Sequence, residues 1–122
     1  MSANNNNPVV EIDEKFYEEW MKLHADQAVA DADLIIYTDG LSVLEKKIMQ
    51  EVDEAFAKNN AGKRLPEYLQ RRDAKSDSRY ADNIRAKAKA AAKQRMLRGA
   101  IKMKEMQFEE WRTRSANRRY SI

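Results

Sequence analysis

Clustered cations, with a tyrosine among the first of them, are the side chains of this sequence best placed to do chemistry. They gather in residues 63–72 and again, at intervals of four, on an alanine-rich stretch further along the chain. Lysine and arginine neutralise phosphates, and exposed tyrosines stack on unpaired bases. The pattern predicts a surface for single-stranded nucleic acid made by Lys63, Arg64, Tyr68, Arg71, Arg72, Arg85, Lys89 and Lys93. A second basic stripe follows at Arg95, Arg98 and Lys102.

Side chains suited to catalysis are scarce. His24 is the only histidine and there is no cysteine, so a nucleophile would lack its usual base. Asp26, Asp31 and Asp33 lack the glycine-bearing loop of a calcium site, and on a helix they point in different directions. No glycine-rich phosphate loop occurs. We therefore predict no enzymatic activity, no metal site and no cofactor.

Charge is segregated along the chain. Residues 1–61 carry 5 Lys/Arg and 13 Asp/Glu, while residues 62–122 carry 18 and 7, which gives net charges of −8 and +11. The basic half predicts a polyanionic partner, single-stranded DNA or RNA, and the acidic half can steer self-association or mimic the polyanion. No apolar run is long enough to span a membrane, and the absence of cysteine fits a reducing compartment. We expect a cytoplasmic protein, or one in the host cytoplasm if it is viral.

Heptad spacing predicts the helices that position these residues. Residues spaced alternately by four and three indicate a helix that buries a narrow stripe against another helix, as in a coiled coil. We call this stripe the seam; it consists of Phe16, Trp20, Leu23, Gln27, Ala30, Leu34, Tyr37, Leu41, Leu44 and Ile48. A helix pair this polar has little apolar area for a stable monomer, so we predict that the seam joins copies into a homo-oligomer.

Turn-forming residues divide the chain into segments. We expect a disordered tail over residues 1–12 and one all-α domain over 13–122, a long helical hairpin with a helix at about 13–57, a basic connector at 58–77 and a helix at about 78–117. Thr38-Asp39-Gly40 is a turn signal inside the first helix, but the seam keeps its phase there, so we favour a continuous helix over two helices. The charge density of the connector argues against its burial, although Pro66 could start a short helix.

Two stretches have a pattern found in a known family. Leu34-Ile35-Ile36-Tyr37 runs on to Glu45-Lys46-Lys47-Ile48-Met49, and Lys63-Arg64-Leu65-Pro66-Glu67-Tyr68 follows. They resemble the UvsY-type recombination mediators of tailed bacteriophages, namely the helix leading into their DNA-binding segment and that segment itself, Lys-x-Arg-Leu-acid-Tyr. The resemblance implies that Lys63 and Arg64 contact single-stranded DNA. It also implies two protein partners, because the family loads a recombinase onto DNA coated by a single-strand-binding protein.

Two functions of different classes follow from these patterns. The first is a non-enzymatic accessory protein that binds single-stranded nucleic acid in phage recombination or replication. The alternative is a structural coiled-coil scaffold or adaptor, virion-associated or bacterial, whose basic half meets an acidic protein surface. Salt-dependent binding to oligonucleotides distinguishes the two, because only the first requires contacts with phosphates.

Overall fold

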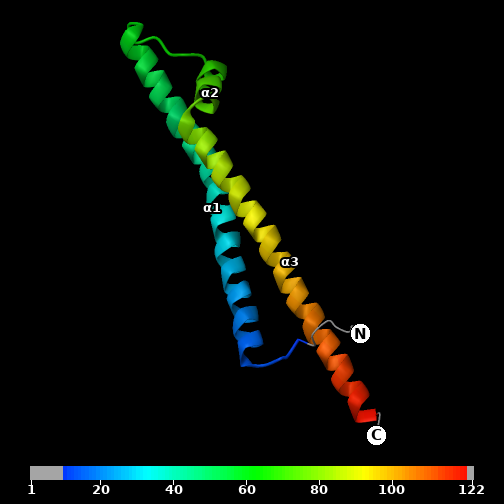
Figure 1. Ribbon diagram of the computed structural model, residues 1–122. Helices are drawn as coiled ribbons and strands as arrows, with labels where there is room; N and C mark the ends of the chain where they lie inside the picture. The colour runs from blue at the N-terminus through cyan, green and yellow to red at the C-terminus, as the bar shows by residue number, and fades with distance from the viewer. Residues whose placement is uncertain (1–9, 121–122) are drawn as a thin grey trace, which may run out of the picture. The chain divides into compact units, whose positions relative to one another are not determined.

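A computed structural model describes residues 10–120 of the chain as helices and their connections (Figure 1). The helices of this described part are α1 (Glu14–Asn59), α2 (Glu67–Lys75) and α3 (Ser78–Tyr120), and no strand occurs among its residues. The predicted all-α class is therefore confirmed. Of the tail predicted at residues 1–12, residues 1–9 lie outside the described part. No helix within residues 10–120 combines the length and the apolar character needed to cross a membrane.

The two long helices take part in two compact units. Unit 1 combines α1 up to Val29 with α3 from Gln94 onward, and unit 2 is the stretch Ala30–Lys93. The sequence predicted one helical domain and gives no sign of this division, because the heptad spacing continues unchanged from Gln27 to Ala30 and beyond.

Local hydrogen bonds fix the start and the continuity of α1. The Oδ1 atom of Asp13 accepts the backbone N–H of Phe16 at 2.9 Å, which satisfies one of the amides left free at a helix start. At the expected turn signal the hydroxyl of Thr38 donates to the carbonyl of Leu34 at 2.7 Å, one helical turn back. The helix continues through Gly40, where a side chain would have open space.

The seam faces the interior of each unit. Phe16 is buried in unit 1, Ala30 and Ile48 are buried in unit 2, and the other seam residues are half-buried. α3 supplies buried residues to the same interiors, Ala90 in unit 2 and Leu97 and Ile101 in unit 1. Three of the ten seam residues are therefore fully buried within a single chain, and the other seven are partly covered. The seam as an interface between copies stays a prediction.

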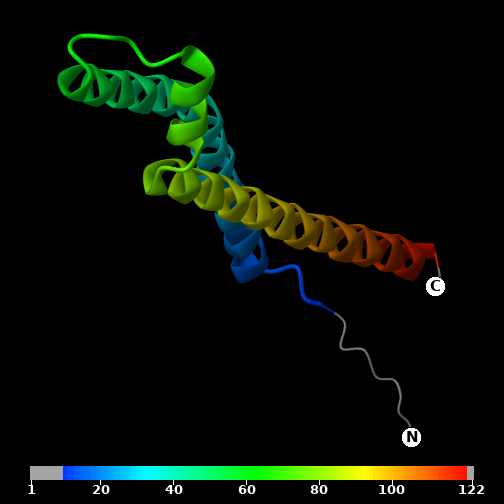
Figure 2. The same cartoon turned by 90° about the horizontal axis from the view of Figure 1, so that it is seen from above.

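The segment after α1 is folded back and partly buried. α1 ends in a left-handed turn, with Ala61 at a φ of 57° and Gly62 at 80°, and the Gly62 N–H donates to the carbonyl of Ala57 at 2.9 Å. α2 then lies beside the C-terminal part of α1 (Figure 2). Within α2, Gln70 and Ala74 are buried. The expectation that charge keeps this connector unburied is wrong at these two positions, because its uncharged residues turn inward.

Candidate nucleic-acid interface

Arg64 is held by a carboxylate of α1. Its Nε donates to Oδ2 of Asp53 at 3.2 Å, while the backbone N–H of Leu65 donates to Oδ1 of the same residue at 2.9 Å. The carbonyl of Leu65 in turn accepts the amide of the buried Gln70 at 2.7 Å. The connector is therefore fastened to α1 at Asp53. The guanidinium of Arg64 is exposed, but this carboxylate already occupies one of its donors.

The two arginines predicted on α2 are also paired. The Nε of Arg71 lies 3.2 Å from a carboxylate oxygen of Glu45, and its terminal nitrogen lies 3.1 Å from Glu67. Arg72 contacts Asp73 at 3.1 Å. Arg71 thereby links α2 to α1. A guanidinium that already has two carboxylate partners has less charge to offer a phosphate, so Arg71 is better placed to hold the fold than to bind a ligand.

Lys63 and Tyr68 stand apart from these paired arginines. Both side chains are exposed, and Tyr68 has a relative accessibility of 71%. No carboxylate of the described residues forms an ion pair with Lys63. An exposed tyrosine ring offers a flat face on which an unpaired base can stack. Within the connector, Lys63 and Tyr68 are therefore the predicted residues whose side chains are free to contact a phosphate and a base.

The basic stripe of α3 in unit 2 is largely without carboxylate partners. Arg85, Lys89 and Lys93 follow one another at intervals of four residues on an α-helix and are all exposed. Arg85 contacts Asp82 at 3.0 Å, one turn back on the same helix, where both side chains are mostly in solvent. Within residues 10–120, Lys89 and Lys93 belong to no ion pair. Their ammonium groups are available to phosphates.

Unit 1 contains the second basic stripe, and its members are likewise exposed. Arg95, Arg98 and Lys102 form no ion pair with any carboxylate of the described residues. Lys104 differs from them: its Nζ lies 4.4 Å from the ring centroid of Phe16 and donates to Glu19 at 2.8 Å. This bond holds the pKa of the Glu19 carboxyl below its usual value. Lys104 therefore belongs to the packing of unit 1.

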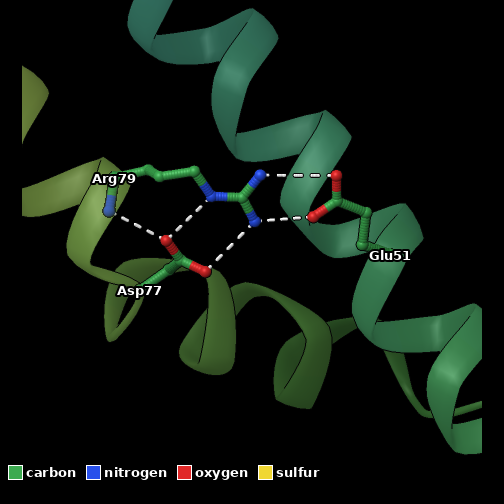
Figure 3. Close-up of polar contacts among 3 residues, drawn as sticks. All are labelled: Glu51, Asp77 and Arg79. Carbon is green, nitrogen blue, oxygen red and sulfur yellow. Dashed lines mark hydrogen bonds and ion pairs between the residues drawn. The ribbon is translucent and has the colours of Figure 1, made fainter.

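Arg79 makes the most extensive ionic contact among the described residues, and sequence analysis missed it (Figure 3). Its guanidinium donates to Glu51 at 2.6 Å and to Asp77 at 3.1 Å. The Asp77 carboxylate also accepts the Arg79 backbone N–H at 2.8 Å and so caps α3. These hydrogen bonds lower the pKa of Glu51 and Asp77 and raise that of Arg79. Asp77 before the helix was the only local signal, because Glu51 lies far away in the sequence.

Taken one by one, the eight predicted binding residues fall into two groups. Arg64, Arg71, Arg72 and Arg85 form ion pairs with neighbouring carboxylates. Lys63, Tyr68, Lys89 and Lys93 are exposed and without such partners in the described part of the chain. The same residues include no cluster of carboxylate or histidine side chains suited to a metal ion.

Comparison with known proteins adds no further assignment. No protein-family model, no curated protein and no solved structure matches this chain. The exposed cations and Tyr68 are therefore the features that bear on its function.

Proposed function

We propose that this chain is a non-enzymatic protein that binds single-stranded nucleic acid through the unpaired cations of α3. One observation carries the proposal: every charged side chain between Asn83 and Lys104 is a cation. Lys89 and Lys93 of unit 2 are exposed members of this run with no carboxylate to neutralise them in the described structure. Such residues displace the counterions condensed on a phosphate backbone, and this release drives binding.

Tyr68 supports single strands over duplexes as the ligand. The side chain of Tyr68 has a relative accessibility of 71%. It lies on α2, and the exposed Lys63 comes shortly before this helix in the sequence. Stacking on an aromatic side chain requires an unpaired base and tolerates any sequence. The bases of a duplex are stacked on one another, so they are not available to this ring. We therefore infer binding with little sequence preference.

A narrower role rests on the resemblance to UvsY-type mediators alone. In that role the chain would load a recombinase onto DNA coated by a single-strand-binding protein, and both proteins would be partners. Of the positions that match the family segment, Lys63 and Tyr68 are exposed, whereas Arg64 is paired with Asp53. We therefore assign the phosphate contact in this segment to Lys63 and place Arg64 among the residues that hold the connector.

The salt dependence of binding to a single-stranded 30-mer tests the proposal. Changing Lys89 and Lys93 together to Ala should reduce the slope of log affinity against log salt by about 1.4, since each lost phosphate contact contributes about 0.7. The matched control changes Lys15 and Lys22, which removes the same charge from a part of α1 where both are paired with carboxylates. Equal effects of the two pairs would show that only net charge matters and would overturn the proposal. So would an absence of binding by the wild-type chain at about 50 mM salt.

Replacing Tyr68 with Ala tests the stacking contact separately. Loss of one stacked base should weaken binding by about 1 to 3 kcal/mol and leave the salt slope unchanged, because stacking releases no counterions. Equal affinity of the wild type and the variant would exclude Tyr68 from the site. Duplex DNA of the same length serves as the control ligand, on which the substitution should have no effect.

The scaffold function predicted as the alternative has one observation in its favour. Large apolar side chains, among them Ile35, Ile36 and Val43, are exposed on the described surface of unit 2. Exposed apolar residues in a group indicate a contact with another protein. These residues lie on α1, apart from the basic stripe of α3 in the same chain.

A further inference from the structure

The outer surface of α1 in unit 2 carries apolar side chains that the fold leaves mostly exposed to solvent. Ile35, Ile36 and Val43 have relative accessibilities of 60%, 62% and 69%. Branching at Cβ lowers helix propensity, so these residues are also poorer helix formers than the lysine or glutamate usual on a solvated face. Three of them within nine residues, all turned to solvent, indicate a surface that another molecule covers.

Acidic residues accompany this apolar surface and restrict what can cover it. Asp39 lies between Ile36 and Val43 at intervals of three and four, so the three share one face of the helix, and Asp33 is one turn before Ile36. Both carboxylates are exposed. Between Lys22 and Lys46 the chain has no cation at all. A partner that excludes water from this face must have cationic side chains opposite the two aspartates, because burial of an unpaired carboxylate is strongly unfavourable.

α3 of the same unit has a surface of the opposite charge and a similar apolar strip. Ile84, Ala88 and Ala92 follow one another at intervals of four, are exposed, and allow close approach by another helix. Directly beside them runs the basic stripe of Arg85, Lys89 and Lys93. The two faces are thus complementary in charge, and each has an apolar strip.

We propose that the outer face of α1 in unit 2 docks on the outer face of α3 in unit 2 of a second copy of this chain. Docking places Asp33 and Asp39 opposite the Lys89 and Lys93 pair of the other copy and covers Ile36 and Val43 against Ala88 and Ala92. A pairing of two α1 faces would place Asp39 against Asp39 and is disfavoured by repulsion. The seam takes no part in this contact, because it faces the interior of each unit, on the other side of α1.

Charge exchange between the two faces tests the pairing directly. The wild-type chain should sediment with at least twice its 14.2 kDa mass at low salt. Asp33→Lys with Asp39→Lys, and separately Lys89→Glu with Lys93→Glu, should each raise the dissociation constant by about tenfold or more, since like charges then face each other. An equimolar mixture of the two double variants should recover the wild-type mass, because every contact regains opposite charges.

Three outcomes would overturn this proposal. The first is a wild-type mass of one chain at low salt, and the second is a mass that the aspartate substitutions leave unchanged. The third is a mixture of the two double variants that stays monomeric, although circular dichroism shows that each variant keeps its helix content. Met106→Asp is the matched control: it places a charge on an exposed apolar residue of unit 1 and should leave the mass unchanged. Docking covers the lysines that the proposed function assigns to phosphates, so a second copy and an oligonucleotide compete for Lys89 and Lys93. The aspartate variants keep all cations of α3 and should bind oligonucleotides at least as tightly as the wild type, so failure of dimerisation is distinguishable from failure of nucleic-acid binding.

Discussion

Unit 1 and unit 2 use the same two helices but hold them together by different interactions. In unit 1 aromatic rings meet across the pair, with Trp20 and Phe108 at a centroid distance of 5.6 Å and Phe108 also in contact with Tyr17 and Trp111. In unit 2 the buried residues are smaller, and arginine–carboxylate contacts link the elements, as between Arg79 and Glu51. Apolar burial dominates one unit and ionic contacts supplement it in the other.

This difference separates structural cations from available ones within unit 2. The arginines that link elements, Arg64, Arg71 and Arg79, are paired with carboxylates of α1. Lys89 and Lys93, on a single helix, are not. The planar guanidinium suits two-pronged contact with carboxylates, whereas an ammonium group on a flexible stem suits phosphates along a mobile strand. Within unit 2, arginines therefore link the helices, while lysines remain available for phosphates.

Removal of an aromatic ring should have the largest effect and break unit 1. Phe16 is only 3% exposed, so Phe16→Ala should lower the free energy of unfolding by about 3 kcal/mol or more through lost burial and a cavity. Urea denaturation measures the change. Met21→Ala, at a position 71% exposed on the same helix, is the control and should stay within about 0.5 kcal/mol. Equal losses in the two variants would contradict the assignment of Phe16 to the core.

Glycine substitutions should have an intermediate effect that is the same in both units. Gly40 in unit 2 and Gly99 in unit 1 are helical, and a methyl group at either would meet no atom within 4 Å. Each change to Ala should raise the free energy of unfolding by about 1 kcal/mol, through helix propensity and a less flexible unfolded chain. Thermal melts at one fixed protein concentration measure it.

Gly62 provides the contrast to these two glycines. Its φ of 80° lies in the left-handed region, so Gly62→Ala should destabilise the chain. Destabilisation by Gly40→Ala would mean that the turn signal Thr38-Asp39-Gly40 does interrupt α1.

The smallest effect is expected for the surface ion pairs of unit 2, and it should depend on pH and salt. Hydrogen bonds from Arg79 lower the pKa of Glu51 and Asp77 from their ordinary values of 4.5 and 3.8. A lowered carboxyl pKa stabilises the fold above the ordinary pKa, and this stabilisation is lost as the pH falls through the folded-state pKa. Arg79→Gln should therefore lower Tm at pH 7, and the difference from wild type should fade in acid below these values.

High salt provides the second arm of this experiment. Screening should shrink the difference in Tm between the wild type and Arg79→Gln at pH 7, because both partners are exposed to solvent. Arg95→Gln, which removes an exposed and unpaired cation of unit 1, is the control and should show no such dependence on salt. A difference in Tm that is the same at pH 7 and in acid would show that Arg79 acts through packing and not through its charge.

The helices could be predicted from the sequence because their pattern is local. The seam from Phe16 to Ile48 repeats every three or four residues, and its inward orientation follows from helix geometry alone. What covers the seam could not be predicted, since the stripe on α3 mixes Ala90, Leu97 and Ile101 with polar residues and gives a weaker pattern. An apolar stripe looks the same whether its partner is another helix of the chain or another copy.

The candidate interface could be predicted only as a set of charges. A sequence does not distinguish Arg64, which meets Asp53 when the connector folds back, from Lys89, which meets no carboxylate of the described residues. That distinction depends on contacts between distant residues, such as Arg71 with Glu45. The exposure of Tyr68 was easier to predict, because a tyrosine among charged residues on a short helix has few apolar neighbours to cover it.

The sequence distance between partners also gives the two units different places in the order of folding. Contacts of unit 2 join residues 11 and 28 positions apart, at Arg64–Asp53 and Arg79–Glu51, whereas Lys104 and Glu19 of unit 1 are 85 positions apart. Closing a long loop costs more chain entropy than closing a short one, and contacts between near residues form faster. Unit 2 should therefore form first. During synthesis on the ribosome, Phe16, Tyr17 and Trp20 must wait for Lys104 and Phe108, so this aromatic stretch stays open to aggregation or to a chaperone for longer than the residues of unit 2.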